Sequence, residues 1–413
     1  NPDVTDWRRM RRITESRKKG CKVVVIDPRH TSTASKTADE YIPIRPGTDT
    51  ALALGMIRLV LEQGRQDERF ITENTVGPLL VRGDNGLLLR ESDVKEGGSN
   101  EQFMVFDTNT GAVQPSDAPG SKPVLTGICS PAGIECRPAY QLLSDMVQGY
   151  TLERVSEITE IPIEVIRSLA VAYASHRPAS IHRGWGLQRT FHGDLTCRAL
   201  NTLAAITGNV NMNIPSPFFE MNSSFATPGG LCTSIPIMSL YDQIAKQQPF
   251  PVKALWFASN NFVSQSPNQK RILTELLPQI ELVVVADLFM TATAKHADYV
   301  LPVSSSFECS DLHYGLMSWT NYMHLQQKVI EPLYESKPDF QIAAELGRKM
   351  GLNDYFDKTE EQYIEDILST DHPLMEGISL ESLKAGPVPE KVINRPRKLR
   401  TPTGRVEFYV ERL

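Results

Sequence analysis

Two segments of this chain carry the same series of residues at nearly the same spacing, and this repeat limits the possible folds more than any other feature. The first segment reads VVVIDPR and then TADE, and the second reads VVVADLF and then KHAD. An asparagine precedes the first aspartate by 26 positions in both segments, Asn1 before Asp27 and Asn261 before Asp287. The second aspartate follows after 12 positions in one segment and 11 in the other, with a proline 4 positions later in both. We therefore interpret the segments as two copies of one strand–helix–strand unit.

Each repeated aspartate ends a run of apolar, mostly β-branched residues, which is typical of strands buried on both faces of a parallel sheet. Strands and helices alternate around these runs; PGTDTALALGMIRLVLEQG, for example, predicts an apolar helix from about residue 48 or 49 to 63. Such alternation is typical of α/β proteins. We expect two doubly wound, mostly parallel-sheet domains of the Rossmann-like type, related by the internal repeat.

The same patterns predict where the domains begin and end. We expect a first domain over 1–245, with a turn-rich insertion and a hairpin over about 66–135, and a second domain over 246–355. Residues 356–413 are predicted to be a linker and the start of a further, truncated region. The chain opens at Asn1-Pro2 without a methionine and ends soon after the strand-like RVEFYV. We therefore expect it to be part of a longer polypeptide.

Composition and missing motifs disfavour several functional classes. The formal net charge of −6 argues against nucleic acid as the main partner, because that footprint is basic. No apolar run approaches the roughly 18 residues that a membrane span needs. The six cysteines are scattered without a CxxC pair, which disfavours an intrinsic zinc or iron–sulfur site and gives no disulfide framework. The phosphate-binding patterns GxxxxGK[ST] and GxGxxG are also absent.

The aspartates at the strand ends have the chemistry of a nucleotide site. Ligands of open parallel sheets bind outside the carboxyl ends of the strands. A carboxylate there accepts hydrogen bonds from ribose hydroxyls or from adjacent N–H donors of guanine. The helix that follows PGTD offers backbone N–H groups to an anion. A lone aspartate after a strand is often only a turn residue, but two within a matched repeat favour a ligand, and we predict a large nucleotide-bearing cofactor.

At this point the sequence resembles the molybdopterin oxidoreductase family, the group that contains dimethyl sulfoxide reductases, formate dehydrogenases and periplasmic nitrate reductases. The resemblance rests on collinear stretches that span nearly the whole chain. These are NP, IDPRHTSTASKTADEYIPIRPGTDTALALGMI, RGWGLQRTFHGDLTCRALNTLAAITGNV, ADLFMTATAKHADYVLPVSSSFE, ESKPDFQIAAELGRKMG and TPTGRVEFY.

The resemblance implies a bis-molybdopterin guanine dinucleotide cofactor with Mo or W. It assigns one guanosine diphosphate end to Asn1, Asp27, Arg29, Gly47 and Asp49. It assigns the other cofactor, or its approach, to Gly184, Gly186, Asn260, Asn261, Asp287 and Thr291. The second copy has Asn260-Asn261 where the family usually has Asn-Pro. The match to the family pattern is therefore weaker at this cofactor contact than at Asn1-Pro2.

Other parts of such an enzyme are expected outside this chain. The resemblance implies that the metal-ligating residue and a 4Fe–4S cluster segment lie upstream, and that a β-barrel completing the pterin sites lies after TPTGRVEFY. No metal ligand is predicted within the chain, and we expect this part alone to be inactive. His192 and Arg189 are the candidates for the substrate side, although His192 equally fits a helix N-terminus, and Glu308 is expected to be structural.

The resulting hypothesis is the cofactor-binding core of a molybdenum or tungsten oxidoreductase, which performs two-electron redox or oxygen-atom transfer on a small molecule with an electron-transfer subunit as partner. Three alternatives stay open: a non-redox hydratase on the same scaffold, a non-catalytic subunit like the large peripheral subunit of respiratory complex I, and an unrelated protein that binds one GDP-like ligand. The sequence determines neither the substrate nor the choice between Mo and W. The compartment is equally open and is the cytoplasm or periplasm of a bacterium or archaeon.

Overall fold

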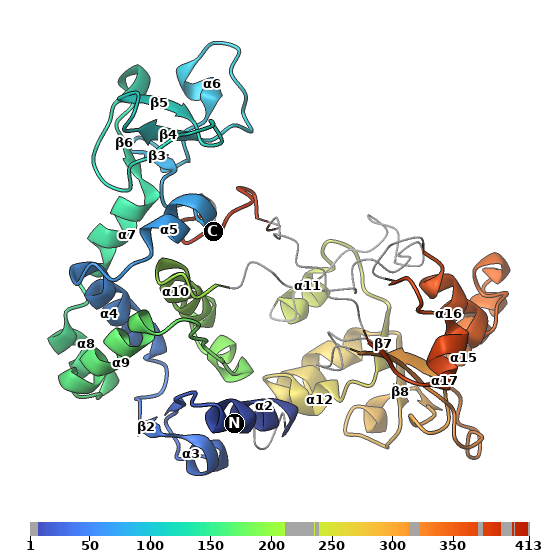
Figure 1. Cartoon of the computed structure of the whole chain (residues 1–413). Helices are drawn as coiled ribbons and strands as arrows, with labels where there is room; N and C mark the ends of the chain where they lie inside the picture. Colours follow the sequence, from blue (N-terminus) through green and yellow to red (C-terminus); the bar gives the residue numbers. More distant parts are fainter. Residues whose placement is uncertain are drawn as a thin grey trace. The chain divides into compact units, whose positions relative to one another are not determined.

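The computed structural model describes residues 7–210, 235, 239–313, 322–370, 375–389, 399 and 401–411. The chain divides into two compact units (Figure 1). Unit 1 consists of Asn1–Asn213 with Pro396–Leu413, and unit 2 of Ile214–Arg395. The predicted boundaries at 245 and 355 do not coincide with this division, in which residues 396–413 belong to unit 1.

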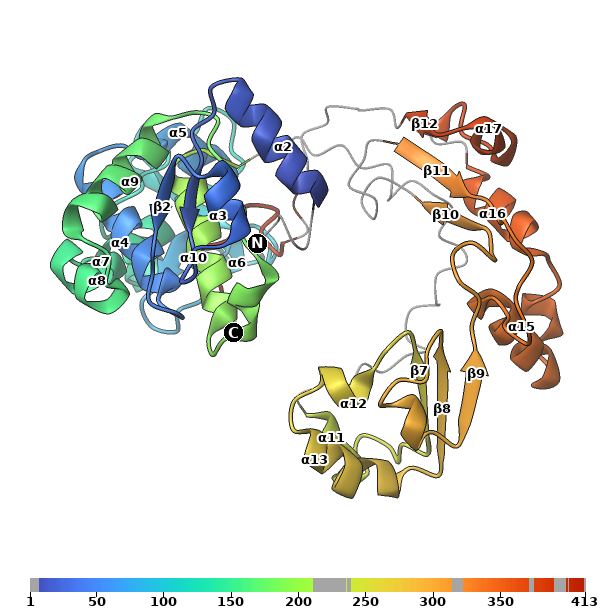
Figure 2. The same ribbon diagram turned by 90° about the horizontal axis from the view of Figure 1, so that it is seen from below.

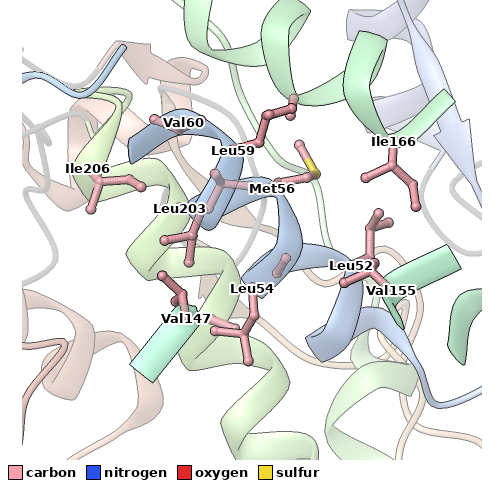
Figure 3. Close-up of a cluster of buried hydrophobic side chains, with 14 of the residues drawn as sticks. Leu52, Leu54, Met56, Leu59, Val60, Val147, Val155, Ile166, Leu203 and Ile206 are labelled. Carbon is pink, nitrogen blue, oxygen red and sulfur yellow. The ribbon is translucent and has the colours of Figure 1, made fainter. Parts of the chain in front are cut away.

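The core of unit 1 is helical and surrounds α4 (Asp49–Glu62). This helix is buried almost all round from Ala51 to Val60, as its continuous apolar sequence predicts. Figure 3 shows its side chains between those of the neighbouring helices. These neighbours are α7 (Ala139–Val147), α8 (Leu152–Thr159), α9 (Ile163–Ser175) and α10 (Gly193–Ile206). A Cβ added at Gly55 would lie 2.7 Å from a methyl group of Val155, so glycine is what lets α4 and α8 approach this closely.

A small parallel sheet lies at one side of this core. It consists of β1 (Val24–Ile26) and β2 (Glu40–Ile42), with α2 (Trp7–Lys18) before it and α3 (Ser32–Thr37) between the strands. The stretch 179–185, which the sequence predicts as a further strand, has no strand in the structure, and Trp185–Arg189 forms the 3₁₀ turn η2. Ile181 is its only β-branched residue, so the segment has little strand propensity.

Antiparallel strands form a separate lobe of unit 1 within the predicted insertion. One pair joins β3 (Leu80–Arg82) to β6 (Cys136–Pro138), and another joins β4 (Met104–Asp107) to β5 (Ala112–Pro115). The lobe also contains α6 (Glu91–Val94) and η1 (Pro131–Gly133), and α5 (Glu68–Asn74) leads into it. Residues 401–411 return to this region, where Val406 pairs with Thr75 in a parallel bridge.

Unit 2 begins with a three-stranded parallel sheet in the order β7-β8-β9. The strands are β7 (Ala254–Ala258), β8 (Leu282–Asp287) and β9 (Tyr299–Pro302). Figure 2 shows the helices α11 (Leu240–Lys246), α12 (Phe262–Gln265) and α13 (Gln269–Arg271) on one side of this sheet. The sequence of residues 267–279 predicts one helix, and in the structure α13 is followed by a π-helical turn, η4 (Ile272–Leu276), and a 3₁₀ turn, η5 (Leu277–Gln279). Pro278 lacks the N–H of a regular helix, which accounts for this ending.

The rest of unit 2 is a small antiparallel sheet with helices. The sheet order is β10 (Asp311–His313), β11 (Tyr322–Gln326) and β12 (Val388–Pro389). The helices are η6 (Ala294–His296) near β9, then α15 (Asp339–Lys349), η7 (Asn353–Tyr355), α16 (Glu360–Leu368) and α17 (Leu380–Ala385). The fold is therefore mixed α and β with sheets of two or three strands, smaller than the predicted doubly wound sheets. Among the described residues, no helix is long and apolar enough to span a membrane.

Candidate nucleotide-binding sites

The two repeated aspartates close the same local turn at the ends of β1 and β8. The Oδ1 of Asp27 accepts a hydrogen bond from the backbone N–H of Arg29 (2.9 Å). The Oδ1 of Asp287 accepts from the backbone N–H of Phe289 (3.1 Å). Each carboxylate therefore uses one oxygen to hold its turn at the carboxyl end of a parallel strand, the edge at which such sheets bind ligands.

The second aspartate of each segment has a structural contact. Asp39 accepts from the backbone N–H of Val23, and Asp298 accepts from that of Val283, both at 2.7 Å. Asp39 also pairs with Arg17 of α2. Each of these carboxylates holds the beginning of the preceding strand. The two repeated segments therefore share this hydrogen bond from the strand backbone to the second aspartate.

Thr291, predicted from the resemblance to line the cofactor, makes a local hydrogen bond. Its Oγ1 accepts from the N–H of Ala294 (3.2 Å), as the Oγ1 of Thr31 accepts from the N–H of Ala34 (3.4 Å). Both threonines lie four residues after the strand aspartate. The sequence comparison did not single out Thr31, although its equal spacing is the signal that would have identified it.

Asp49 and Asp27 form an electrostatically coupled pair in unit 1. Asp49 begins α4 and is half-buried. Burial raises the pKa of the Asp49 carboxyl, and the charge of Asp27 raises it further. Gly47, just before the helix, has a φ of +80°, and a Cβ there would meet no described atom within 4 Å. Gly47 and Asp49 are thus two positions apart at the start of α4, and the charge of Asp27 acts on Asp49. Arg29 is exposed, and Asn1 lies outside the described residues.

The first turns of α4 and α10 lie side by side. The hydroxyls of Thr50 and Thr196 are 2.8 Å apart, and each belongs to the first turn of its helix. Two helix N-termini that converge present backbone N–H groups and positive dipole ends to the same region. This is a favourable environment for a phosphate or diphosphate group.

The loop before α10 contains the remaining candidates of unit 1. Gly184 and Gly186 are exposed, and a Cβ at either would meet no described atom within 4 Å. Arg189 is exposed at the end of η2. His192 precedes α10 in a left-handed conformation (φ 56°), and its ring lies 3.9 Å from that of Phe191, centroid to centroid. A role of Arg189 or His192 toward a substrate stays a prediction.

In unit 2, Asn261 supports the loop after β8. Its side-chain oxygen accepts from both the backbone N–H (3.2 Å) and the hydroxyl (3.0 Å) of Thr293, which is fully buried. The neighbouring Asn260 is exposed. Of the set that the resemblance grouped with Asp287, Gly184 and Gly186 belong to unit 1, and the other members belong to unit 2.

Glu308 occupies the position in unit 2 that corresponds to Asp49, six residues after the proline of its segment. Its side chain is buried, and its two oxygens accept from the backbone N–H groups of Ser305 (2.7 Å) and Leu333 (2.6 Å). Glu308 therefore ties two loops together, the structural role that the sequence predicted. The two segments differ at this point, since Asp49 lies at an open helix end whereas both oxygens of Glu308 are already used.

Glu308→Gln is expected to lower the stability of unit 2 mainly at pH values at which Glu308 is ionised. Hydrogen bonds from Ser305 and Leu333 lower the pKa of Glu308. A lowered pKa in the folded state adds stability above the unfolded pKa, and this stability is lost as the pH falls through the folded pKa. Thermal unfolding from pH 3 to 7 should show a melting temperature several degrees below that of the unmodified chain at pH 7 and a flatter acid limb. Glu331→Gln, on an exposed carboxylate, is the control; equal pH profiles of Glu308→Gln and the parent would contradict the assignment.

Residues 5–349 match the family model described as molybdopterin oxidoreductase. The chain belongs to the molybdopterin oxidoreductase family. This confirms the family that the sequence motifs indicated.

Other members of the family are similar along most of the chain. Dimethyl sulfoxide reductase DmsA of Escherichia coli is 26% identical over 445 residues, covering 96% of this chain and 49% of that protein. Perchlorate reductase subunit alpha of Dechloromonas aromatica is 28% identical over 416 residues, covering 82% of this chain and 44% of that protein. The chain thus spans about half the length of the curated relatives it matches.

Among solved structures, acetylene hydratase from Pelobacter acetylenicus has a similar fold. The TM-score is 0.69 at 24% identity, and the match covers 96% of this chain and 52% of that one. At this identity the likeness concerns the fold alone.

Proposed function

We propose that this chain binds the guanosine ends of a bis-molybdopterin guanine dinucleotide cofactor in an enzyme that performs two-electron redox or oxygen-atom transfer on a small molecule. The observation that carries the proposal is the pair formed by Asp27 at the end of β1 and Asp49 at the start of α4. A half-buried carboxylate whose ionisation is opposed by burial and by a second carboxylate favours a ligand that brings N–H donors.

The residues fit such a group. The edge of guanine carries adjacent ring and exocyclic N–H donors, which a carboxylate can accept together. The converging first turns of α4 and α10 suit the diphosphate. Open space at Gly47 lets a ligand approach the backbone closely. When bound, the cofactor supplies a metal held by pterin dithiolenes that exchanges electrons or an oxygen atom, while the protein positions it.

In this proposal the second guanosine end belongs to unit 2 and to Asp287, Asn260 and the backbone after β8. Both oxygens of Glu308 accept hydrogen bonds from Ser305 and Leu333. Glu308 therefore cannot assist Asp287 in binding guanosine as Asp49 is proposed to assist Asp27. We therefore infer that the two guanosine ends are held unequally, by two carboxylates in unit 1 and by one in unit 2.

The names of the relatives support a reductase. Those cited above are a sulfoxide reductase and a perchlorate reductase, and the latter is named as a subunit, which agrees with an electron-transfer partner. The metal ligand and a 4Fe–4S cluster are proposed to come from the part of the protein outside this chain. A hydratase is the second candidate, supported by the fold of acetylene hydratase. The acidic residues Asp27, Asp49 and Asp287 argue against a complex I-like subunit that has lost the cofactor.

Analysis of the full-length protein, produced in metal-replete cells, tests the proposal. We expect Mo or W by elemental mass spectrometry and two GMP molecules per metal after acid hydrolysis of the released cofactor. Oxidation of a reduced viologen by dimethyl sulfoxide or perchlorate would distinguish a reductase from a hydratase, which instead converts acetylene without an electron donor. Protein with neither metal nor pterin would refute the proposal. The isolated chain should bind GDP only weakly and show no turnover.

A further inference from the structure

Two cysteines face each other in the antiparallel lobe of unit 1. Cys129 and Cys136 form an antiparallel bridge in which each backbone N–H donates to the carbonyl of the other, at 3.0 and 2.8 Å. Residues directly opposite in such a ladder point to the same side of the sheet. The sulfur of Cys129 lies 3.9 Å from the carbonyl oxygen of Cys136. Both side chains belong to the same small apolar cluster, with Leu80, Leu89 and Met104.

We propose that Cys129 and Cys136 are a site of reversible oxidation and form an intrachain disulfide. Opposed residues of a hydrogen-bonded antiparallel pair have Cα atoms about 5.5 Å apart, which lies within the roughly 4.4–6.8 Å range of disulfides. The Cβ atoms of a hydrogen-bonded pair lie at the wide end of the cross-strand range, about 5.5 Å apart, so closure requires the two Cβ atoms to approach by about 1–2 Å. Both cysteines are thiols in the structure.

An external disulfide such as oxidised glutathione can oxidise the two thiols by thiol–disulfide exchange. Cys129 is partly exposed and Cys136 is fully buried, so the oxidant meets Cys129 first. The Cys129 thiolate attacks one sulfur of oxidised glutathione and releases one glutathione thiolate. The Cys136 thiolate then attacks the Cys129 sulfur of the mixed disulfide and releases the second. In total the two thiols lose two protons and two electrons, and one oxidised glutathione becomes two reduced molecules.

The surroundings make this a slow reaction. Burial raises the pKa of the Cys129 thiol, and burial together with Cys129 raises the pKa of Cys136 to about 12. The reactive thiolates are therefore scarce at neutral pH. We expect oxidation over hours in an oxidising buffer, faster at pH 9 than at pH 7.

The cross-link would stabilise the end of a long irregular segment. Residues 116–129 connect β5 to the bridge, and β6, which follows Cys136 directly, continues into α7. Closing a ring of about eight residues restricts the unfolded chain. We expect oxidation to raise the melting temperature of unit 1 by roughly 3–8 °C and to slow proteolysis between residues 116 and 129.

Mass spectrometry of the whole chain after incubation in glutathione buffers tests the proposal. Cleavage after glutamates separates the two cysteines at Glu135, so their peptides stay joined only if the disulfide has formed. We expect the joined peptides to predominate in the oxidised buffer and to separate after reduction. The exposed Cys21 should instead take up glutathione.

Variants provide the controls. Cys129→Ser should lose both the joined peptides and the oxidation-dependent rise in melting temperature. Cys136→Ala, which suits the buried site, should leave Cys129 as a mixed disulfide with glutathione. The proposal is overturned if Cys129 of the unmodified folded chain stops at the mixed disulfide. It is also overturned if both cysteines are alkylated when the chain, incubated folded in a buffer that oxidises the unfolded chain, is afterwards denatured.

Discussion

Replacing Asp27 by asparagine in the full-length protein is expected to lower its metal and pterin content about tenfold or more. The amide keeps an oxygen for the N–H of Arg29, so the turn after β1 persists. The asparagine side chain has no charge, and an NH₂ group replaces the second carboxylate oxygen. Because this NH₂ group is a donor, it cannot accept a hydrogen bond from the N–H groups of guanine. Removing a hydrogen bond to a charged group costs about 1.5–3 kcal/mol, and about 1.4 kcal/mol corresponds to a factor of ten in affinity.

The matched control is Asp84→Asn, which makes the same chemical change at a turn residue of the antiparallel lobe that pairs with Arg82. Its metal and GMP content per folded protein should stay at the parent level. Asp287→Asn should also lower the content, since it is the corresponding residue of unit 2. Normal metal and GMP content in Asp27→Asn would exclude a direct role for this carboxylate, even if the protein as a whole contained the cofactor.

A cofactor-free preparation of the chain separates the ligand role of Asp49 from a structural one. The raised pKa of Asp49 means that the folded state favours its protonated form, so stability decreases as the pH rises from the unfolded pKa through the folded pKa. Asp49→Asn should therefore melt above the parent at pH 7, with the difference shrinking at acidic pH, while the full-length variant loses cofactor. A lower melting temperature at pH 7 would instead indicate that Asp49 stabilises the start of α4.

Local sequence patterns were sufficient for the parts of the fold that depend on neighbouring residues. The apolar run in Asp49–Glu62 predicted a buried helix, and the runs before Asp27 and Asp287 predicted parallel strands. The carboxyl-end position of these aspartates follows from strand direction alone. The grouping of Asp27 with Asp49, which lies at the start of a helix, came instead from the family resemblance.

Contacts between distant residues could not be predicted in this way. Glu308 is held by Leu333, which lies 25 positions later, and no local pattern signals that bond. The bridge between Cys129 and Cys136 depends on the pairing of strands across a turn, so counting short cysteine motifs missed it. The β-rich appearance of RVEFYV suggested a separate region, but Arg405 and Tyr409 of this stretch bond to residues 289 to 333 positions earlier, in unit 1.

Deleting residues 401–413 is expected to have the largest effect on stability, lowering the free energy of unfolding of unit 1 by about 5 kcal/mol or more. Arg405 donates to the carbonyls of Thr72, Thr75 and Ser116, at 3.1–3.2 Å. Val406 exchanges backbone hydrogen bonds with Asn74 and Val76. Each such bond contributes about 1 kcal/mol net, and uncovering a large apolar side chain costs about 1.5–3 kcal/mol.

The last residues of the segment add three further contacts. Phe408 packs against two of the apolar clusters of unit 1, and the Tyr409 hydroxyl donates to the carbonyl of Gly86 (2.6 Å). Arg90 and Glu411 form a two-point ion pair at 2.7 and 2.8 Å, with both side chains mostly buried. Because a domain is typically stable by about 5–15 kcal/mol in total, the deletion should remove a large share of the stability of unit 1.

Denaturant unfolding followed by tryptophan fluorescence and circular dichroism would measure this loss. Tyr409→Phe, which removes one hydroxyl and keeps the ring, should cost only about 1 kcal/mol and serves as the graded control. Adding a synthetic peptide of residues 399–413 to the truncated chain should restore part of the lost stability, because the contacts do not require a covalent connection. An unchanged unfolding midpoint after the deletion would show that the C-terminal segment contributes nothing to the stability of unit 1. Loss of stability without rescue by the peptide would mean that the link through residues 390–398 must be intact for the segment to bind.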